Sequence, residues 1–146
     1  PGYPRGLTFG TKVGDRTPDG RETWLRIWEN SLSVPGIACD HLGKLAKELK
    51  TWLVIGVIER GESGSLYCTT LYFNEQGELV GKHRKLKPTA AERIIWGEGD
   101  GSDLEVYESN FGSISGLAVA ANVLVWGIVF LIRRHGNQDI DDVIFC

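Results

Sequence analysis

The chain has 146 residues and a mass of 16.1 kDa, which fits a single domain with its own hydrophobic core. Its 42% apolar and 24% charged content is typical of a soluble globular protein and excludes a disordered or collagen-like chain. The formal net charge of -3 provides no basic surface, so we exclude nucleic acid as a partner. The cysteines Cys39, Cys68 and Cys146 are widely spaced and form no cluster with histidine, which predicts neither a disulfide framework nor a metal site and indicates a reducing, cytoplasmic compartment.

The first 20 residues read as a loop, because proline and glycine recur throughout them. The sequence contains no methionine and opens with PGYPRG, without the apolar stretch of a signal peptide. We therefore expect the sequence to be a piece of a longer protein, with removal of an initiator methionine ahead of Pro1 as the alternative.

Two helices are predicted next. Over residues 21–32 the apolar side chains recur at spacings of three, four and seven, as one buried helix face requires. The four-residue spacing of Trp24 and Trp28 puts both in the core of this helix face. Asp40 is the expected N-cap of a second helix that ends near Lys50.

Strands follow the helices. Residues 52–58 are a short apolar run rich in β-branched side chains, which predicts a strand covered on both faces. Residues 66–73 and 78–86 form a predicted hairpin with a turn at 74–77, and residues 104–107 pair with a strand from 113 to about 119. This order predicts an α+β fold whose sheet is covered on one side by helices.

Several polar residues have an ordinary structural interpretation when taken singly. A lysine such as Lys85 in a basic strand end is usually a solvated charge, and Glu92 completes a capping box that starts at Thr89. His83 has no carboxylate or cysteine partner at a recognisable spacing, which favours a structural role. The glycines at 97, 99 and 101 resemble a phosphate loop only superficially, because no strand precedes them and acidic residues alternate with them.

Taken together, five segments carry a more specific signal. They are GYPRG at residues 2–6, GVIER at 56–60, GKHRKLKPT at 81–89, the Glu92-Arg93 pair, and WGEGDGS at 96–102. Together with Phe111-Gly112, they are colinear with, and closely resemble, the nitrilase branch of the carbon–nitrogen hydrolase superfamily. The resemblance covers residues 1–117, so we expect a partial carbon–nitrogen hydrolase domain there and a divergent apolar tail over residues 118–146.

The resemblance implies part of a four-layer α-β-β-α sandwich and catalysis by a glutamate, a lysine and a cysteine, without a cofactor. In that family the cysteine thiolate attacks a nitrile carbon, a glutamate is the general base, and the lysine stabilises the tetrahedral intermediates. Such chemistry needs an activated soft nucleophile, a base within hydrogen-bond reach and a fixed cation where negative charge develops.

The family's roles transfer only in part. Lys85 matches the catalytic lysine, and Glu92 matches a second glutamate that positions the lysine and the substrate. The base glutamate belongs in a segment directly before Gly2-Tyr3-Pro4, and the nucleophile belongs after Gly116-Leu117, where this sequence has Ala118. None of the three cysteines aligns with the nucleophile, and Cys68 reads as a buried, unreactive thiol.

The apolar run over residues 114–132 leaves three interpretations. Its 19 uncharged residues are followed by Arg133-Arg134, which satisfies the length rule for a membrane span. Residues 118–132 alone would instead fit a buried strand or helix. The third interpretation is that the tail is foreign to the family, through a retained intron, a frameshift or a gene-model error, and does not pack as a nitrilase half.

The sequence thus predicts a nitrilase-family hydrolase that converts a small nitrile to a carboxylic acid and ammonia, inactive as this chain because two of three catalytic groups are missing. The alternative is a non-catalytic interaction protein or membrane-anchored pseudoenzyme. We expect a homo-oligomer in the cytoplasm, with the membrane as the alternative location.

Overall fold

A computed structural model describes residues 15–88, 93–116, 130–132 and 143–144. Its main sheet has the strand order β3-β2-β1-β6-β7, and all neighbouring pairs are antiparallel. The strands are β1 (Trp52–Arg60), β2 (Leu66–Phe73), β3 (Leu79–Arg84), β6 (Phe130–Ile132) and β7 (Val143–Ile144). A separate hairpin consists of β4 (Tyr107–Ser109) and β5 (Gly112–Ile114). Helix and sheet are both present, as the α+β prediction requires.

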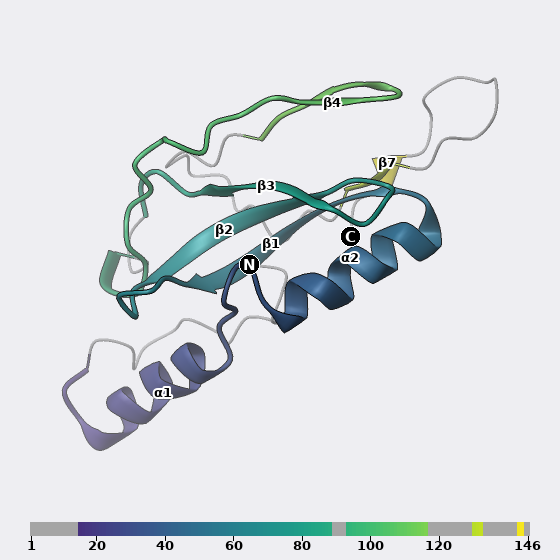
Figure 1. Cartoon of the computed structure of the whole chain (residues 1–146). Helices are drawn as coiled ribbons and strands as arrows, with labels where there is room; N and C mark the ends of the chain where they lie inside the picture. The colour runs from purple at the N-terminus through teal and green to yellow at the C-terminus, as the bar shows by residue number, and fades with distance from the viewer. Residues whose placement is uncertain (1–14, 89–92, 117–129, 133–142, 145–146) are drawn as a thin grey trace.

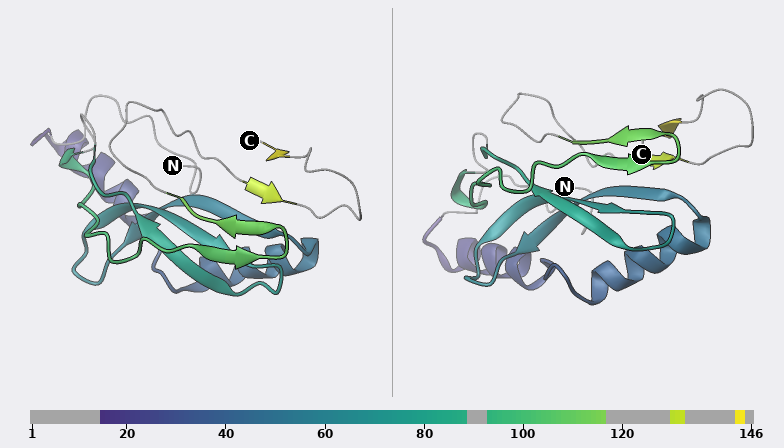
Figure 2. Two further views of the ribbon diagram at one scale, coloured as in Figure 1. Left: turned by 90° about the horizontal axis from the view of Figure 1, so that it is seen from above. Right: turned by 45° about the horizontal axis from the view of Figure 1, so that its top comes forward.

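The elements form layers around the main sheet. Helix α2 (Ile37–Leu49) covers one face of β1–β3, and the β4–β5 hairpin lies over the opposite face (Figure 1; Figure 2). Helix α1 (Pro18–Glu29) packs near the end of β1. A helix, a sheet and a hairpin are thus stacked in that order, and the complete four-layer sandwich stays a prediction.

Strand β1 is the buried centre of this arrangement. Seven of its first eight residues are buried, because β2 and β6 flank it and both of its faces are covered. The prediction of a strand covered on both faces is therefore confirmed, and the strand extends two residues further than expected, through Glu59 and Arg60.

The predicted β2–β3 hairpin is confirmed with its turn. The Asn74 side chain accepts hydrogen bonds from the backbone N–H groups of Gln76 and Glu78, and Gly77 adopts a φ of 85°. That positive φ favours glycine, since it has no Cβ to clash with the backbone. Strand β3 ends at Arg84, so Lys85 directly follows its last residue.

Both helices begin earlier than expected. Helix α1 begins at Pro18 instead of residue 21, because Thr17 is its N-cap and accepts a hydrogen bond from the N–H of Gly20. Helix α2 begins at Ile37, and Asp40 lies in its first turn, where a carboxylate favours the helix dipole, instead of capping it. Helix α1 ends at Glu29, and α2 ends as predicted, with Lys50 as its C-cap.

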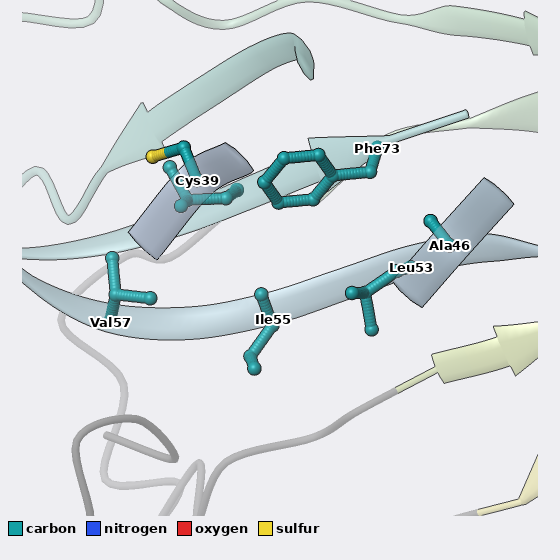
Figure 3. Packing of buried hydrophobic residues seen from close by; sticks show 7 residues of the cluster. Cys39, Ala46, Leu53, Ile55, Val57 and Phe73 are labelled. Carbon is teal, nitrogen blue, oxygen red and sulfur yellow. The ribbon is translucent and has the colours of Figure 1, made fainter. Parts of the chain in front are cut away.

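The main core lies between α2 and the sheet. Apolar side chains from the helix interdigitate with those of β1 and β2 (Figure 3). The cluster consists of Cys39, Ala46, Leu53, Ile55, Val57, Leu71 and Phe73. A second cluster around Ile27 and Trp96 joins α1 to the other end of the sheet. Trp24 is 37% exposed and stacks on the half-buried Trp28, so placing Trp24 in the core was wrong.

Two described pieces of the apolar run 114–132 are strands. Ile114 ends β5, and Phe130–Ile132 pairs with Trp52–Val54 of β1 as strand β6. Among the described residues no helix is long and apolar enough to span a membrane. Residues 117–129 lie outside the described residues, and the expected second strand of the last hairpin ends at Ile114 instead of near residue 119.

Candidate functional site

The basic residues Lys82, His83 and Arg84 form the end of β3, and Lys85 follows them. Within the strand, neighbouring side chains point to opposite faces. Lys82 and Arg84 share the face that carries α2, and His83 lies on the other face. We call residues 82–85 the lysine block. Glu59 binds the lysine block on one face of the sheet and Asp103 binds it on the other.

On the α2 face the lysine block is tied to one carboxylate, that of Glu59 at the end of β1. Arg84 donates to it from Nε at 2.9 Å and from Nη2 at 2.7 Å, and Lys82 donates from Nζ. The hydroxyl of Thr69 donates at 2.8 Å. Glu59 is only 1% exposed, so its buried carboxylate is the centre of an ion cluster that links β1, β2 and β3 and whose two cations are partly exposed.

Electrostatics in this cluster favour the charged forms. Burial alone would raise the pKa of the Glu59 carboxyl, but the hydrogen bonds from Arg84, Lys82 and Thr69 outweigh it and hold that pKa below its ordinary value. The Glu59 carboxylate in turn raises the pKa of Arg84. The Arg84 guanidinium also stacks on the Tyr67 ring, 4.0 Å from its centroid.

On the opposite face His83 is 1% exposed and is paired with Asp103. Its Nδ1 lies 3.0 Å from Asp103 Oδ1, and the backbone N–H of Arg84 donates to Asp103 Oδ2 at 2.9 Å. One carboxylate therefore holds both a side chain and a peptide group of the lysine block. His83 thus has a carboxylate partner, although Asp103 lies 20 residues further along the chain and at no recognisable spacing.

Lys85 is anchored through its own backbone. Its N–H donates to the carbonyl of Cys68 on β2 at 2.8 Å, and its carbonyl accepts from the N–H of Gly99 at 2.9 Å. Gly97 donates to the carbonyl of Leu66 at 2.7 Å, so residues 97–103, the glycine loop, run directly against the ends of β2 and β3. Lys85 is half-buried at this junction.

The glycines of this loop are needed for close approach to the strands. A Cβ at Gly99 would lie 2.5 Å from the Arg84 carbonyl oxygen, and one at Gly97 would lie 2.7 Å from the Tyr67 ring. Both distances are shorter than real contacts allow, so a side chain would push the loop off the strand ends. These glycines therefore allow close packing of the loop against the residues around Lys85.

The remaining candidates lie apart from this site. Glu92 and Cys146 lie outside the described residues. Cys39 belongs to the α2 core, and burial raises the pKa of its thiol. Cys68 is half-buried instead of buried, and its carbonyl lies directly against the Lys85 N–H.

A cavity of about 580 Å³ lies away from the lysine block, at the other end of β3. It is located between the Asn74–Gly77 turn and the β4–β5 hairpin, and its lining includes Trp52 and Tyr107. Among the described residues no group of three His, Cys, Asp or Glu side chains could hold a metal ion.

Sequence reasoning missed Glu59 and Asp103. A glutamate that ends an apolar strand is a usable signal for the first, because a carboxylate buried next to a core run needs cationic partners. No spacing rule would have found Asp103, since the loop geometry alone brings it to His83.

Comparisons with known proteins identify the family of the chain. A model of the family described as "Carbon-nitrogen hydrolase" matches residues 2–135. The bifunctional nitrilase/nitrile hydratase NIT4A of Nicotiana tabacum is 50% identical over 113 residues, 77% of this chain and 32% of that protein. The aliphatic nitrilase of Sinorhizobium fredii is 45% identical over 123 residues, which are 84% of this chain and 39% of that protein. The arylacetonitrilase of Trametes versicolor is 45% identical over 114 residues, which are 78% of this chain and 35% of that protein.

Among solved structures, an N-terminal amidase is similar with a TM-score of 0.47 and 13% identity, covering 69% of this chain and 24% of that one. The chain spans between 32% and 39% of the length of the three relatives named above. The family match covers most of the chain, including the lysine block and the glycine loop. The chain therefore belongs to the carbon–nitrogen hydrolase family, in its nitrilase branch.

Proposed function

We propose that the lysine block belongs to a nitrile-hydrolysing active site in which Lys85 is the catalytic lysine. The observation that carries this proposal is the anchoring of Lys85. Its N–H and carbonyl are both hydrogen-bonded, and the residues before it are held by Glu59 and Asp103. A cation fixed by its surroundings can stabilise developing negative charge without reorganising during the reaction.

The proposed reaction follows the chemistry of the family. A cysteine thiolate attacks the nitrile carbon and forms a thioimidate, while the nitrile nitrogen takes a proton. Water then adds, ammonia leaves, and the resulting thioester is hydrolysed to a carboxylic acid and the free thiol. The Lys85 ammonium would stabilise the tetrahedral intermediates, and Glu92 would position that lysine and the substrate.

The 146-residue chain itself is predicted to be inactive, because Ala118 follows Gly116-Leu117 where the family's nucleophilic cysteine is expected. Loss of the nucleophile abolishes catalysis by a group of residues that act as a unit. The substrate class is a small nitrile. The relatives are named for aliphatic nitriles and for arylacetonitriles, so either kind is a reasonable first substrate to assay.

A chimera tests the role of Lys85 directly. Residues 2–117 of this chain replace the matching segment of an active nitrilase relative, which keeps its own glutamate base and cysteine. We expect nitrile-dependent ammonia release from the chimera and a fall of 100-fold or more in kcat for Lys85→Ala, as for loss of one oxyanion-stabilising donor. Lys87→Ala is the control, because Lys87 is exposed and pairs with Glu98 at the surface.

If the folded chimera hydrolyses nitriles equally well with and without Lys85, the proposed role is wrong. The unaltered chain is assayed in parallel, and ammonia release by it would contradict the predicted inactivity.

The second candidate is a non-catalytic partner of a related enzyme, and the alanine at position 118 favours it. Under this proposal the chain associates in the cytoplasm with a second copy or with a full-length relative. Size measurement by light scattering, with the chain alone and mixed with a nitrilase relative, tests it. A chain that is monomeric alone and forms no complex with the relative would contradict this proposal.

A further inference from the structure

We propose that His83 is a positioning residue for Lys85, and that it acts through a hydrogen bond from Nδ1 to the Asp103 carboxylate. This inference rests on the proposed function, because the position of Lys85 matters for catalysis only if Lys85 is the catalytic lysine. Its test measures the position of Lys85 and does not use nitrile turnover. The relay consists of three groups in series: the His83 ring, the Asp103 carboxylate and the backbone N–H of Arg84.

The arrangement identifies which ring atom matters. Asp103 Oδ2 already accepts the Arg84 N–H at 2.9 Å, and Oδ1 lies 3.0 Å from His83 Nδ1. A carboxylate is an acceptor only, so the ring donates from Nδ1. His83 Nε2 is buried and has no hydrogen-bond partner among the described residues. The polar contribution of His83 is therefore confined to Nδ1.

The position of Asp103 explains why the ring is needed. Asp103 ends the glycine loop and is 18% exposed, so water competes for its oxygens. A hydrogen bond from the buried His83 ring orients the Asp103 carboxylate toward the Arg84 peptide. In metal sites, a hydrogen-bonded neighbour orients a ligand in the same way. Arg84 immediately precedes Lys85. Loss of the hydrogen bond from the Arg84 N–H to Asp103 would therefore loosen the backbone directly before the lysine.

Two substitutions of His83 separate this role from simple packing. Asparagine places its amide nitrogen near the position of Nδ1, and glutamine places its polar atoms near the position of Nε2. If the Nδ1 hydrogen bond matters, His83→Asn keeps Lys85 in place and His83→Gln does not. If filling the buried space matters, the order is reversed, because glutamine is closer to histidine in volume.

The readouts are local to the strand end. Hydrogen exchange of the Arg84 and Lys85 amides is measured on the folded chain by NMR, with the Val57 amide of the central strand as reference. Acylation of the Lys85 amine by an N-hydroxysuccinimide ester is followed by peptide mapping, with exposed Lys44 as internal reference. For His83→Gln we expect about tenfold faster exchange at Arg84 and Lys85, as for loss of one hydrogen bond, and several-fold faster acylation of Lys85.

His83→Asn should stay within about threefold of the unaltered chain in both measurements, since a net hydrogen bond corresponds to a larger change. Asp103→Ala provides a second variant at a less buried position, and it should match His83→Gln at Arg84 and Lys85 while leaving Val57 unchanged. The inference is overturned if His83→Asn perturbs Lys85 more than His83→Gln does, or if Asp103→Ala leaves the Arg84 and Lys85 amides as they were. Neither result would bear on whether the intact site hydrolyses nitriles.

Discussion

The backbone N–H of Gly99 donates to the carbonyl of Lys85 across a distance of 2.9 Å, and only a glycine can come that close. The contact joins two segments that are 14 residues apart and closes the glycine loop over the end of β3. The position of the Lys85 backbone therefore depends on the conformation of the glycine loop.

Gly99→Ala is expected to lower the free energy of unfolding by about 1–3 kcal/mol, because the added Cβ would overlap the Arg84 carbonyl and the backbone must move. Urea unfolding followed by fluorescence measures the change. Glu98→Ala in the same loop is the control, since Glu98 forms an exposed pair with Lys87 and should change stability by less than about 1 kcal/mol. Equal effects of the two substitutions would show that the close approach of Gly99 is unimportant.

Glu59→Gln is expected to lower the free energy of unfolding by about 3 kcal/mol, because it leaves Arg84 and Lys82 facing a neutral amide inside the fold. The value lies at the low end of the range for buried pairs, since these two cations are 29% and 31% exposed. Glu22→Gln is the matched control, as Glu22 pairs with Arg26 on the exposed surface of α1 and should cost less than about 1 kcal/mol. A loss for Glu59→Gln as small as that of the control would contradict the assigned role of the buried cluster.

The stability of the chain should also depend on pH through Glu59. Its pKa is depressed in the folded state, so its contribution is fully present above the unfolded value near 4.5 and is lost as the pH falls through the folded value. We expect the free energy of unfolding to fall below about pH 4.5, and to fall less steeply in Glu59→Gln. Parallel curves for the two proteins between pH 5 and pH 3 would exclude this contribution.

Asp103→Asn should move the proton of the His83 ring while keeping its neighbours in place. The asparagine oxygen can still accept the Arg84 N–H, but its amide must now donate to Nδ1, which shifts the ring proton to Nε2. Long-range ¹H–¹⁵N spectra report this change, and His83→Gln identifies the His83 signals among the three histidines. The same tautomer in both proteins would contradict the assignment of Nδ1 as the donor.

Local sequence signals predicted the centre of the fold well. The apolar run of β1, the β2–β3 hairpin, and the turn with Asn74 and Gly77 each depend on short-range preferences that the structure preserves. The start of α1 was missed because Thr17 and Pro18, a strong helix start, lie inside a stretch whose glycines and prolines indicate a loop. Trp24 was misplaced because helical spacing identifies a shared face but not what covers that face.

At the candidate site, the resemblance to nitrilases selected Lys85, and the structure adds the groups that surround it. The partner of His83 could not be predicted, because its contact with Asp103 depends on how the glycine loop folds back onto β3. The burial of Glu59 followed from an unexpected extension of β1 by two residues, which carried the carboxylate under Lys82 and Arg84.

Strand β3 is one of the two outermost strands in the described part of the main sheet. An outermost strand presents N–H and carbonyl groups that can pair with another chain, which is a common route to aggregation. Here Asp103 occupies the Arg84 N–H and Gly99 occupies the Lys85 carbonyl. The glycine loop thus also prevents a neighbouring molecule from pairing with this end of the strand. Substitutions that detach the loop should lower the solubility of the protein as well as displace Lys85.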